Sequence, residues 1–353
     1  MTTIGGGYVW PNITIFSDGE RIVLQAKPTQ FRLQEPLHYI ANIAAVVRAN
    51  AFEKSIDQFI EQVRGQLRAE HVGATNLDDV WESVLSERTN PATSERRKFE
   101  ALLGFDPDEA DDTQIDSLIA DAKNLGERAI AEVAADRMAT STTPTGDELK
   151  QIAHDDGFES DPRDTIRFHN VSSLSPYGEV PAWVRGAEAA RLLRIQEQLG
   201  AASISNEKLA NWAAVSVTNL TDNRSRGPSF SFALDENAFR GRVVLRSKWE
   251  TGRRFELARL IGDRVAGVST GKLFPATRSY TYRQQLQRSF AAELLCPFDA
   301  LMDMLRGDFS SEALEDAASH FNVSERTVRT VLMNHRQIER DDIEGDPETG
   351  AAA

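Results

Sequence analysis

The chain has 353 residues, of which 41% are hydrophobic and 27% are charged, and its net charge is −14. This length and composition allow two or three domains with real hydrophobic cores. No apolar run approaches the roughly 18 residues that a membrane-spanning helix needs. Cys296 is the sole cysteine, which excludes an intrachain disulfide and a thiolate zinc cluster. Residues 1–10 are glycine-rich and uncharged, unlike a secretory signal, so we expect a cytoplasmic protein without a membrane partner.

Acidic and basic residues are segregated along the chain. Residues 100–164 hold eighteen Asp and Glu against five Lys and Arg, whereas residues 240–288 hold twelve Lys and Arg against three Asp and Glu. This asymmetry indicates an anionic partner for the basic segment or complementarity between the two segments. Two solvated surfaces of opposite sign are an equally open interpretation.

The first elements are predicted to be a β-hairpin and a group of helices. Apolar and polar residues alternate on both sides of Gly19, which favours a hairpin within residues 1–32. Residues 33–140 form a mostly helical region by their apolar spacing, with helices expected at 36–69, 77–85, 96–103 and 115–138. The Ser, Thr, Pro and Gly residues at 139–146 predict a boundary there, with a linker over 141–165.

After the linker, the pattern is typical of an α+β domain, which we place at residues 166–305. The β-branched run Val243-Val244 suits a buried strand. Strands are expected at 229–234 and 242–246, and helices at 183–199, 206–217, 253–265 and 283–295.

Two of these helices carry a specific sequence pattern. Residues 254–258 read Arg-Phe-Glu-Leu-Ala, Gly262 follows, and residues 290–295 read Phe-Ala-Ala-Glu-Leu-Leu before Pro297. Over about residues 225–300 the chain resembles the ImmA/IrrE family of zinc metallopeptidases, whose two helices have the forms R-F-T-L-A-H-E-L-G-H and E-x-x-A-N-x-F-A-A-E-L-L-M-P. The resemblance implies a metallopeptidase-like fold, a zinc cofactor, and regulation of stress responses or mobile elements by action on a helix-turn-helix repressor.

The residues that would hold this zinc are absent. Such a site needs two neutral histidines four residues apart on one helix, with a glutamate beside the first as general base. Here Arg259 and Asp263 stand at the histidine positions, Leu260 at the glutamate position, and Gln284 at the position of the third ligand. Arg259 is a permanent cation where a dication would bind, so we expect no metal ligands, no catalytic residue and no cofactor. Arg259 and Asp263 are one turn apart and are expected to form an ion pair in the space of the metal, the alternative being that both face solvent.

Residues 306–338 resemble a helix-turn-helix. Asn322 can take the left-handed turn position, and Ser324 can cap the second helix. If the motif binds DNA, the exposed candidates are Arg326, Thr327, Arg329 and Thr330. The alternative, favoured by neighbouring acidic residues, is a helical hairpin that packs on the preceding domain. The acidic residues 339–353 are expected to be a disordered tail.

Three functions from different classes remain open. The interpretation that we favour is a non-catalytic ImmA/IrrE-like regulatory or interaction protein, with a protein partner such as a helix-turn-helix repressor. The second is a DNA-binding transcriptional regulator that uses the helix-turn-helix, and the third is a metallopeptidase with a non-standard site. Metal content separates the third from the others, and salt-dependent binding to duplex DNA separates the second from the first.

Overall fold

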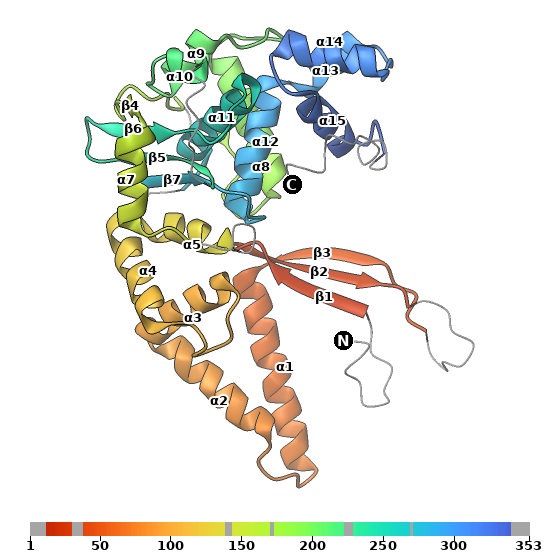
Figure 1. Ribbon diagram of the computed structural model, residues 1–353. Helices are drawn as coiled ribbons and strands as arrows, with labels where there is room; N and C mark the ends of the chain where they lie inside the picture. The colour runs from red at the N-terminus through yellow and green to blue at the C-terminus, as the bar shows by residue number, and fades with distance from the viewer. Residues whose placement is uncertain are drawn as a thin grey trace. The chain divides into compact units, whose positions relative to one another are not determined.

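The computed structural model describes six stretches of the chain, namely residues 12–29, 38–137, 143–169, 173–221, 229–268 and 271–339 (Figure 1). The fold belongs to the expected α+β class, with helices and two small antiparallel sheets. Its contacts divide the chain into a first unit, Met1–Lys98 with Tyr280–Tyr282, and a second unit, Phe99–Ser279 with Arg283–Ala353. Within the stretches described, no helix has both the length and the apolar character required to cross a bilayer.

The first unit contains a three-stranded antiparallel sheet with strand order β1-β2-β3. Strands β1 (Asn12–Ser17) and β2 (Arg21–Lys27) form the predicted hairpin, and Gly19 supplies the positive φ of +94° in its turn. Strand β3 (Ile43–Arg48) pairs with the other side of β2. The prediction of a helix from residue 36 is therefore wrong over β3, because β-branched residues and the pairing with β2 outweigh the helical spacing of its apolar side chains.

Two helices follow in this unit, α1 (Ala49–Ala69) and α2 (Asn76–Thr89). They are tied together by ion pairs of Arg64, whose guanidinium lies 2.6 Å from Asp78 and 3.3 Å from Glu82. Helix α3 (Pro91–Leu103) begins in the first unit and ends in the second.

The second unit opens with α4 (Asp112–Leu125) and α5 (Glu127–Ala135), which replace the single helix expected over 115–138. Gly126 separates them with a φ of +116°, which an L side chain would rarely adopt. The expected linker over 141–165 instead contains α7 (Gly146–Asp156) and β4 (Phe158–Ser160), while residues 138–142 lie outside the described part. Helix α7 belongs to the folded unit because its apolar side chains are buried in the core.

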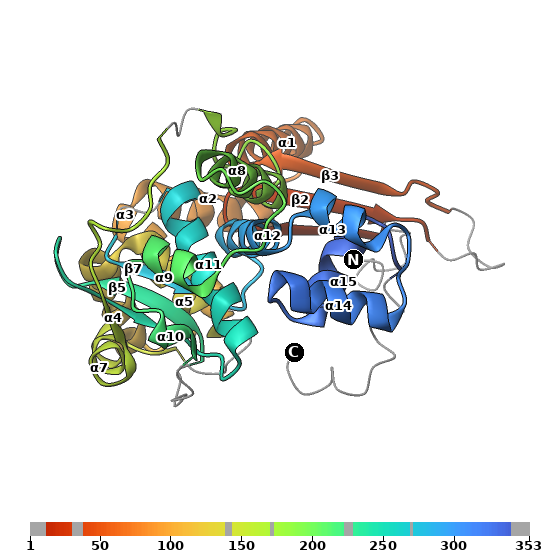
Figure 2. The ribbon, with the colours of Figure 1, turned by 90° about the horizontal axis from the view of Figure 1, so that it is seen from above.

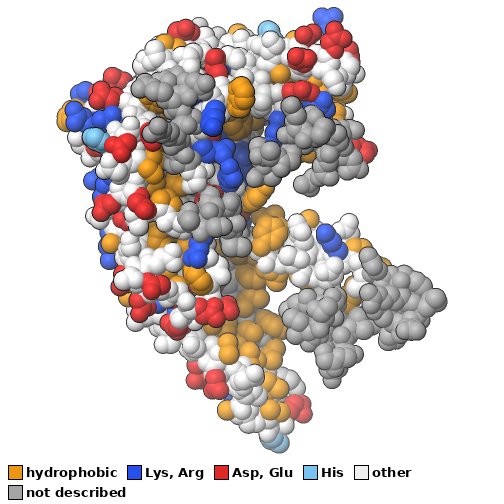
Figure 3. Space-filling view, viewed as in Figure 1, with side chains coloured by type: hydrophobic (Ala, Val, Ile, Leu, Met, Phe, Trp, Pro, Cys, Tyr) orange, Lys and Arg blue, Asp and Glu red, His pale blue; other side chains and the backbone are white. Residues whose placement is uncertain are grey.

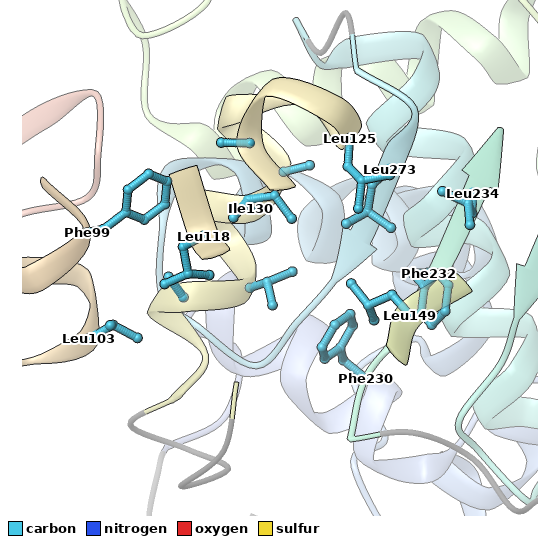
Figure 4. Packing of buried hydrophobic residues seen from close by; sticks show 14 of the residues in the cluster. Phe99, Leu103, Leu118, Leu125, Ile130, Leu149, Phe230, Phe232, Leu234 and Leu273 are labelled. Atoms are coloured by element: carbon cyan, nitrogen blue, oxygen red, sulfur yellow. The ribbon is translucent and has the colours of Figure 1, made fainter. Parts of the chain in front are cut away.

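A four-stranded antiparallel sheet, in the order β4-β6-β5-β7, lies in the second unit. Strands β5 (Ser231–Asp235) and β6 (Gly241–Val244) were predicted, whereas β4 and β7 (Leu273–Ala276) were not. The core packs α3, α4, α5 and α7 against this sheet (Figure 4). Its large members include Phe99, Leu103, Leu118, Leu125, Ile130, Leu149, Phe230, Phe232, Leu234 and Leu273.

The remaining helices complete the second unit, and α11 is at their centre (Figures 1 and 2). It contacts α8, α9, α10 and strands β5 and β7. The helices are α8 (Ala182–Gln196), α9 (Asn206–Trp212), α10 (Thr218–Thr221), α11 (Glu250–Ala266), α12 (Tyr282–Leu295), α13 (Phe298–Leu305), α14 (Ser311–Phe321) and α15 (Glu325–Asn334).

Candidate functional site

Helices α11 and α12, which carry the metallopeptidase-like pattern, pack closely against each other. Gly262 makes this approach possible, because a Cβ atom built on it would lie 2.5 Å from Cδ1 of Phe290 on α12. Ala258 and Leu294 are fully buried in the same region. Four residues of the quoted sequence pattern, Ala258, Gly262, Phe290 and Leu294, are therefore packing residues of the helix pair.

Arg259 lies inside this packed region with only 8% of its surface exposed. Its Nη2 donates to the Thr277 carbonyl oxygen at 2.7 Å, to Oε1 of Gln284 at 2.6 Å, and more weakly to Oε1 of Gln287 at 3.3 Å. Both glutamine side chains in turn donate to the Pro275 carbonyl oxygen at 3.0 Å. We call these residues, Arg259, Pro275, Thr277, Gln284 and Gln287, the arginine plug.

The arginine plug remains positively charged at neutral pH. Burial lowers the pKa of Arg259 to about 9, and repulsion by Arg288 and Arg246 acts in the same direction, while Glu256 and Asp263 oppose it. A group with this pKa is almost fully protonated at pH 7. The plug therefore holds a buried cation, solvated by carbonyl and amide oxygens rather than by a carboxylate bonded directly to it.

Asp263 forms its ion pair with Arg283 of α12, and the expected pair between Arg259 and Asp263 is not formed. The Arg283 guanidinium donates from Nε to Oδ1 at 2.8 Å and from Nη2 to Oδ2 at 2.5 Å. The side chains are 6% and 0% exposed. Burial alone would lower the pKa of Arg283, but the attraction of Asp263 outweighs it and the pKa is raised. Two parallel hydrogen bonds from Arg283 stabilise Asp263 more than a pair with Arg259 would. An arginine four residues before an aspartate is the less favourable order on one helix, which explains the change of partner.

The structure thus brings three of the four marked positions, Arg259, Asp263 and Gln284, to one place between α11 and α12. Leu260, the fourth, is a core residue with 2% exposure. The sequence did not single out Arg283 and Gln287 as partners, although both are polar residues on the helix predicted over 283–295. Zinc prefers imidazole, thiolate and carboxylate donors, so this donor set does not fit it.

No group of three or more His, Cys, Asp or Glu side chains that could hold a metal ion occurs in the described stretches. The sole cysteine, Cys296, is fully buried, and burial raises the pKa of its thiol to about 12. A protonated, enclosed thiol is a packing group and not a nucleophile.

Basic side chains surround the arginine plug. Arg246 and Arg288 are half-buried and close enough to repel the Arg259 charge, and Arg278 is exposed. Arg288 donates to the Ser279 carbonyl oxygen at 2.9 Å. Lys and Arg side chains gather over α11 and α12 on the face drawn in Figure 3, while Asp and Glu side chains spread along α4 and α7. The acidic and basic segments also contact each other, since Arg242 lies 3.7 Å from Glu159 and the Arg278 backbone N donates to Asp136 at 2.7 Å.

The C-terminal helices have the local geometry that the sequence predicted. Asn322 ends α14 in the left-handed conformation with φ 51° and ψ 51°, and Oγ of Ser324 accepts a hydrogen bond from the Thr327 backbone N at 3.2 Å. Val328 and Leu332 are fully buried. Both the turn and the cap are confirmed.

The four candidate DNA-binding residues differ in exposure. Arg326 is exposed, whereas Thr327, Arg329 and Thr330 are half-buried. Arg329 is held by Glu325 at 2.6 Å, one turn earlier on α15. This acid stands at the helix end that would approach the DNA, so it weakens the attraction for phosphate.

The hairpin is bonded to α11. Arg254 is completely buried, and its Nε donates to the Asn322 carbonyl oxygen at 2.9 Å while Nη2 donates to the Ile204 carbonyl oxygen at 2.6 Å. Asn322 also donates to Glu250 at 3.3 Å. The turn between α14 and α15 is therefore fixed to the helix that carries the arginine plug.

Comparison with known proteins gave no match: no family model, no curated protein sequence and no solved structure is similar to this chain.

Proposed function

We propose that this chain is a non-catalytic relative of the ImmA/IrrE metallopeptidases that acts in the cytoplasm as a regulatory or interaction protein. The supporting observation is the arginine plug. A buried guanidinium, bonded at 2.6 Å to the glutamine that stands at the third-ligand position, lies where the resemblance implies zinc. A fixed positive charge repels a dication, and the plug offers amide and carbonyl oxygens in place of imidazoles.

The partner that this surface favours is an acidic segment of another protein. Arg246, Arg278 and Arg288 surround the plug, and complementary charge gives an interface its specificity and association rate. A helix-turn-helix repressor is the partner class that the family resemblance implies. It remains part of the proposal.

Metal content and thermal stability test the non-catalytic part. We expect the purified full-length chain to contain far less than one zinc per molecule and to melt at the same temperature with and without added zinc. Binding to the native state raises stability by mass action, so stoichiometric zinc or a zinc-dependent rise of several degrees would contradict the proposal.

The partner surface is tested by charge reversal. Arg288→Glu should reduce capture of acidic partners from a lysate of the source cells, with Arg163→Glu as the control. Arg163 is an exposed arginine paired with Asp161 at 2.6 Å and outside the basic group around the plug. Equal capture by both variants would contradict the proposal that this surface binds an acidic partner.

DNA binding is a second candidate, favoured by the capped N-terminus of α15 and the exposure of Arg326. It predicts duplex binding that weakens steeply as salt rises and that Arg326→Glu reduces while Arg163→Glu does not. The test is fluorescence anisotropy with labelled duplex at several salt concentrations. Absence of salt-dependent binding would leave the hairpin as a packing element on α11.

A further inference from the structure

The first unit lacks a hydrophobic core of its own. Among the described residues of this unit, 12–29, 38–98 and 280–282, Trp81 and Tyr282 are the only buried hydrophobic side chains. The other buried side chains there are polar, namely Asp18, Arg21 and Arg64. A small sheet needs an apolar cover on one face to be stable, so this unit requires apolar surface from elsewhere.

The strand register shows where that surface is required. Ile15 lies opposite Leu24, and Leu24 lies opposite Ala45 on the third strand. Since alternate residues share a face of a sheet, one face is apolar on all three strands. We call it the apolar sheet face, formed by Ile13, Ile15, Ile22, Leu24, Ala26, Ile43, Ala45 and Val47, with Ser17 at its edge as the one polar member.

None of the eight apolar side chains of the apolar sheet face is buried. Ile15 is 51% exposed and Ile43 is 52% exposed, and the others are half-buried or exposed. The opposite face is mixed, because Phe16 and Val46 share it with Arg21, Gln25 and Lys27. Uncovered apolar surface of this extent marks an interaction site.

We propose that the apolar sheet face binds the same face of a second copy of this chain, giving a two-fold symmetric homodimer. Charge favours this occupant. Residues 12–29 and 38–98 hold eleven Asp and Glu against ten Lys and Arg, whereas the whole chain holds 54 against 40. Two copies of this nearly neutral unit can approach with little repulsion, and an apolar face can pack against an identical face.

The area of the apolar sheet face sets the size of the expected interface. Three strands spaced about 4.8 Å apart, each about six residues long, present a projected area of roughly 300 Å². Accessible area exceeds projected area, so two such faces packed together form a small interface, below about 1,200 Å² in total. Helix α1 of the same unit has a further apolar stripe, in which Phe59 is 57% exposed and Phe52, Ile56, Ile60, Val63 and Leu67 are half-buried.

The test is the mass of the full-length chain in solution, measured by sedimentation at several concentrations. We expect twice the chain mass of 39.2 kDa. Strand β3 offers a matched pair of variants, since Ile43 (52% exposed) lies on the apolar sheet face and Val46 (48% exposed) lies on the opposite face. Ile43→Lys should weaken the dimer at least about 30-fold, and Val46→Lys should change it little.

A second measurement does not depend on destabilising the interface. Leu24 is at the centre of the face, and native Cys296 is buried, so Leu24→Cys supplies the one accessible thiol among the described residues. A short thiol cross-linker should join two copies of this variant. A monomer at all concentrations, with the face covered from within the same chain, would overturn the proposal. So would an equal response of the dimer to both lysine variants, or a dimer that Leu24→Cys does not cross-link.

Discussion

The buried ion pair between Asp263 and Arg283 gives the sharpest test of how α11 and α12 are held together. Asp263→Asn keeps the shape of the side chain and removes its charge. The Arg283 guanidinium then stays buried without its counter-ion. Its Nη1 already has no hydrogen-bond partner among the described residues, so no second acceptor is in place to compensate.

The expected cost follows from the burial of both partners. Asp263 and Arg283 are 0% and 6% exposed. Breaking a buried pair by removing one charge costs about 3–5 kcal/mol, because the other charge is left desolvated. For a unit of this size, each kcal/mol lowers the melting temperature by about 2–4 °C, so we expect a drop of roughly 6–20 °C.

Another pair in the same unit is the matched control. Arg264 and Asp235 also form a two-fold contact, at 2.9 and 2.5 Å, but their side chains are 15% and 19% exposed. Water reaches this pair, so Asp235→Asn should cost less than Asp263→Asn, about 1.5–3 kcal/mol. Urea unfolding followed by circular dichroism measures both variants. Equal losses of unfolding free energy would show that desolvation of Arg283 does not explain the cost of Asp263→Asn.

Three further predictions concern the same helix pair. Gly262→Ala should cost about 1–3 kcal/mol in urea unfolding because the new methyl group meets Phe290, and a neutral result would contradict the close packing. Cys296 should react with a thiol reagent at pH 8 only when the chain unfolds. Because the pKa of its thiol is raised in the folded state, its contribution to stability is complete below pH 9 and is lost as the pH rises toward 12. Urea unfolding of the native chain and of Cys296→Ala at pH 8 and pH 11 measures this loss. Arg259→Met should cost under about 2 kcal/mol, less than Asp263→Asn, because relief from burying a charge offsets the lost hydrogen bonds; a larger cost would mean that the cation itself stabilises the fold.

Local signals in the sequence were sufficient for several elements. The hairpin around Gly19, the helices α11 and α12, and the turn at Asn322 all follow from short-range periodicity or from a residue that favours one conformation. Strands β4 and β7 were not predicted because they are three and four residues long and pair with strands distant in sequence, and β3 was assigned to a helix because its apolar spacing fits one. The secondary structure of such segments is determined by pairing with other strands and not by local propensity.

The sequence indicated which residues lie at the site but not which of them bond to each other. Spacing on a helix shows that Arg259 and Asp263 share a face, but it cannot show which residues a second helix presents to them. Arg283 and Gln284 are neighbours on α12, and the structure gives one to Asp263 and the other to Arg259. The choice depends on the crossing of two helices, which residue periodicity leaves undetermined.

Restoring the metallopeptidase motif provides the last prediction, and Arg283 decides its outcome. Arg259→His, Leu260→Glu and Asp263→His would rebuild two ligands and the general base, but the Arg283 guanidinium, now 2.5 Å from Asp263, would remain beside the new imidazole without its counter-ion. We expect this triple variant to bind zinc weakly and to cleave nothing, since a catalytic site also needs a third ligand and groups that orient each imidazole. Adding Gln284→Glu supplies the third ligand and a new carboxylate beside Arg283, which would pair with it and compete with the metal. Stoichiometric zinc should therefore require Arg283→Leu as well, measured by metal analysis and by a zinc-dependent rise in melting temperature. Tight zinc binding by the triple variant would refute the argument that the buried Arg283 guanidinium excludes the metal.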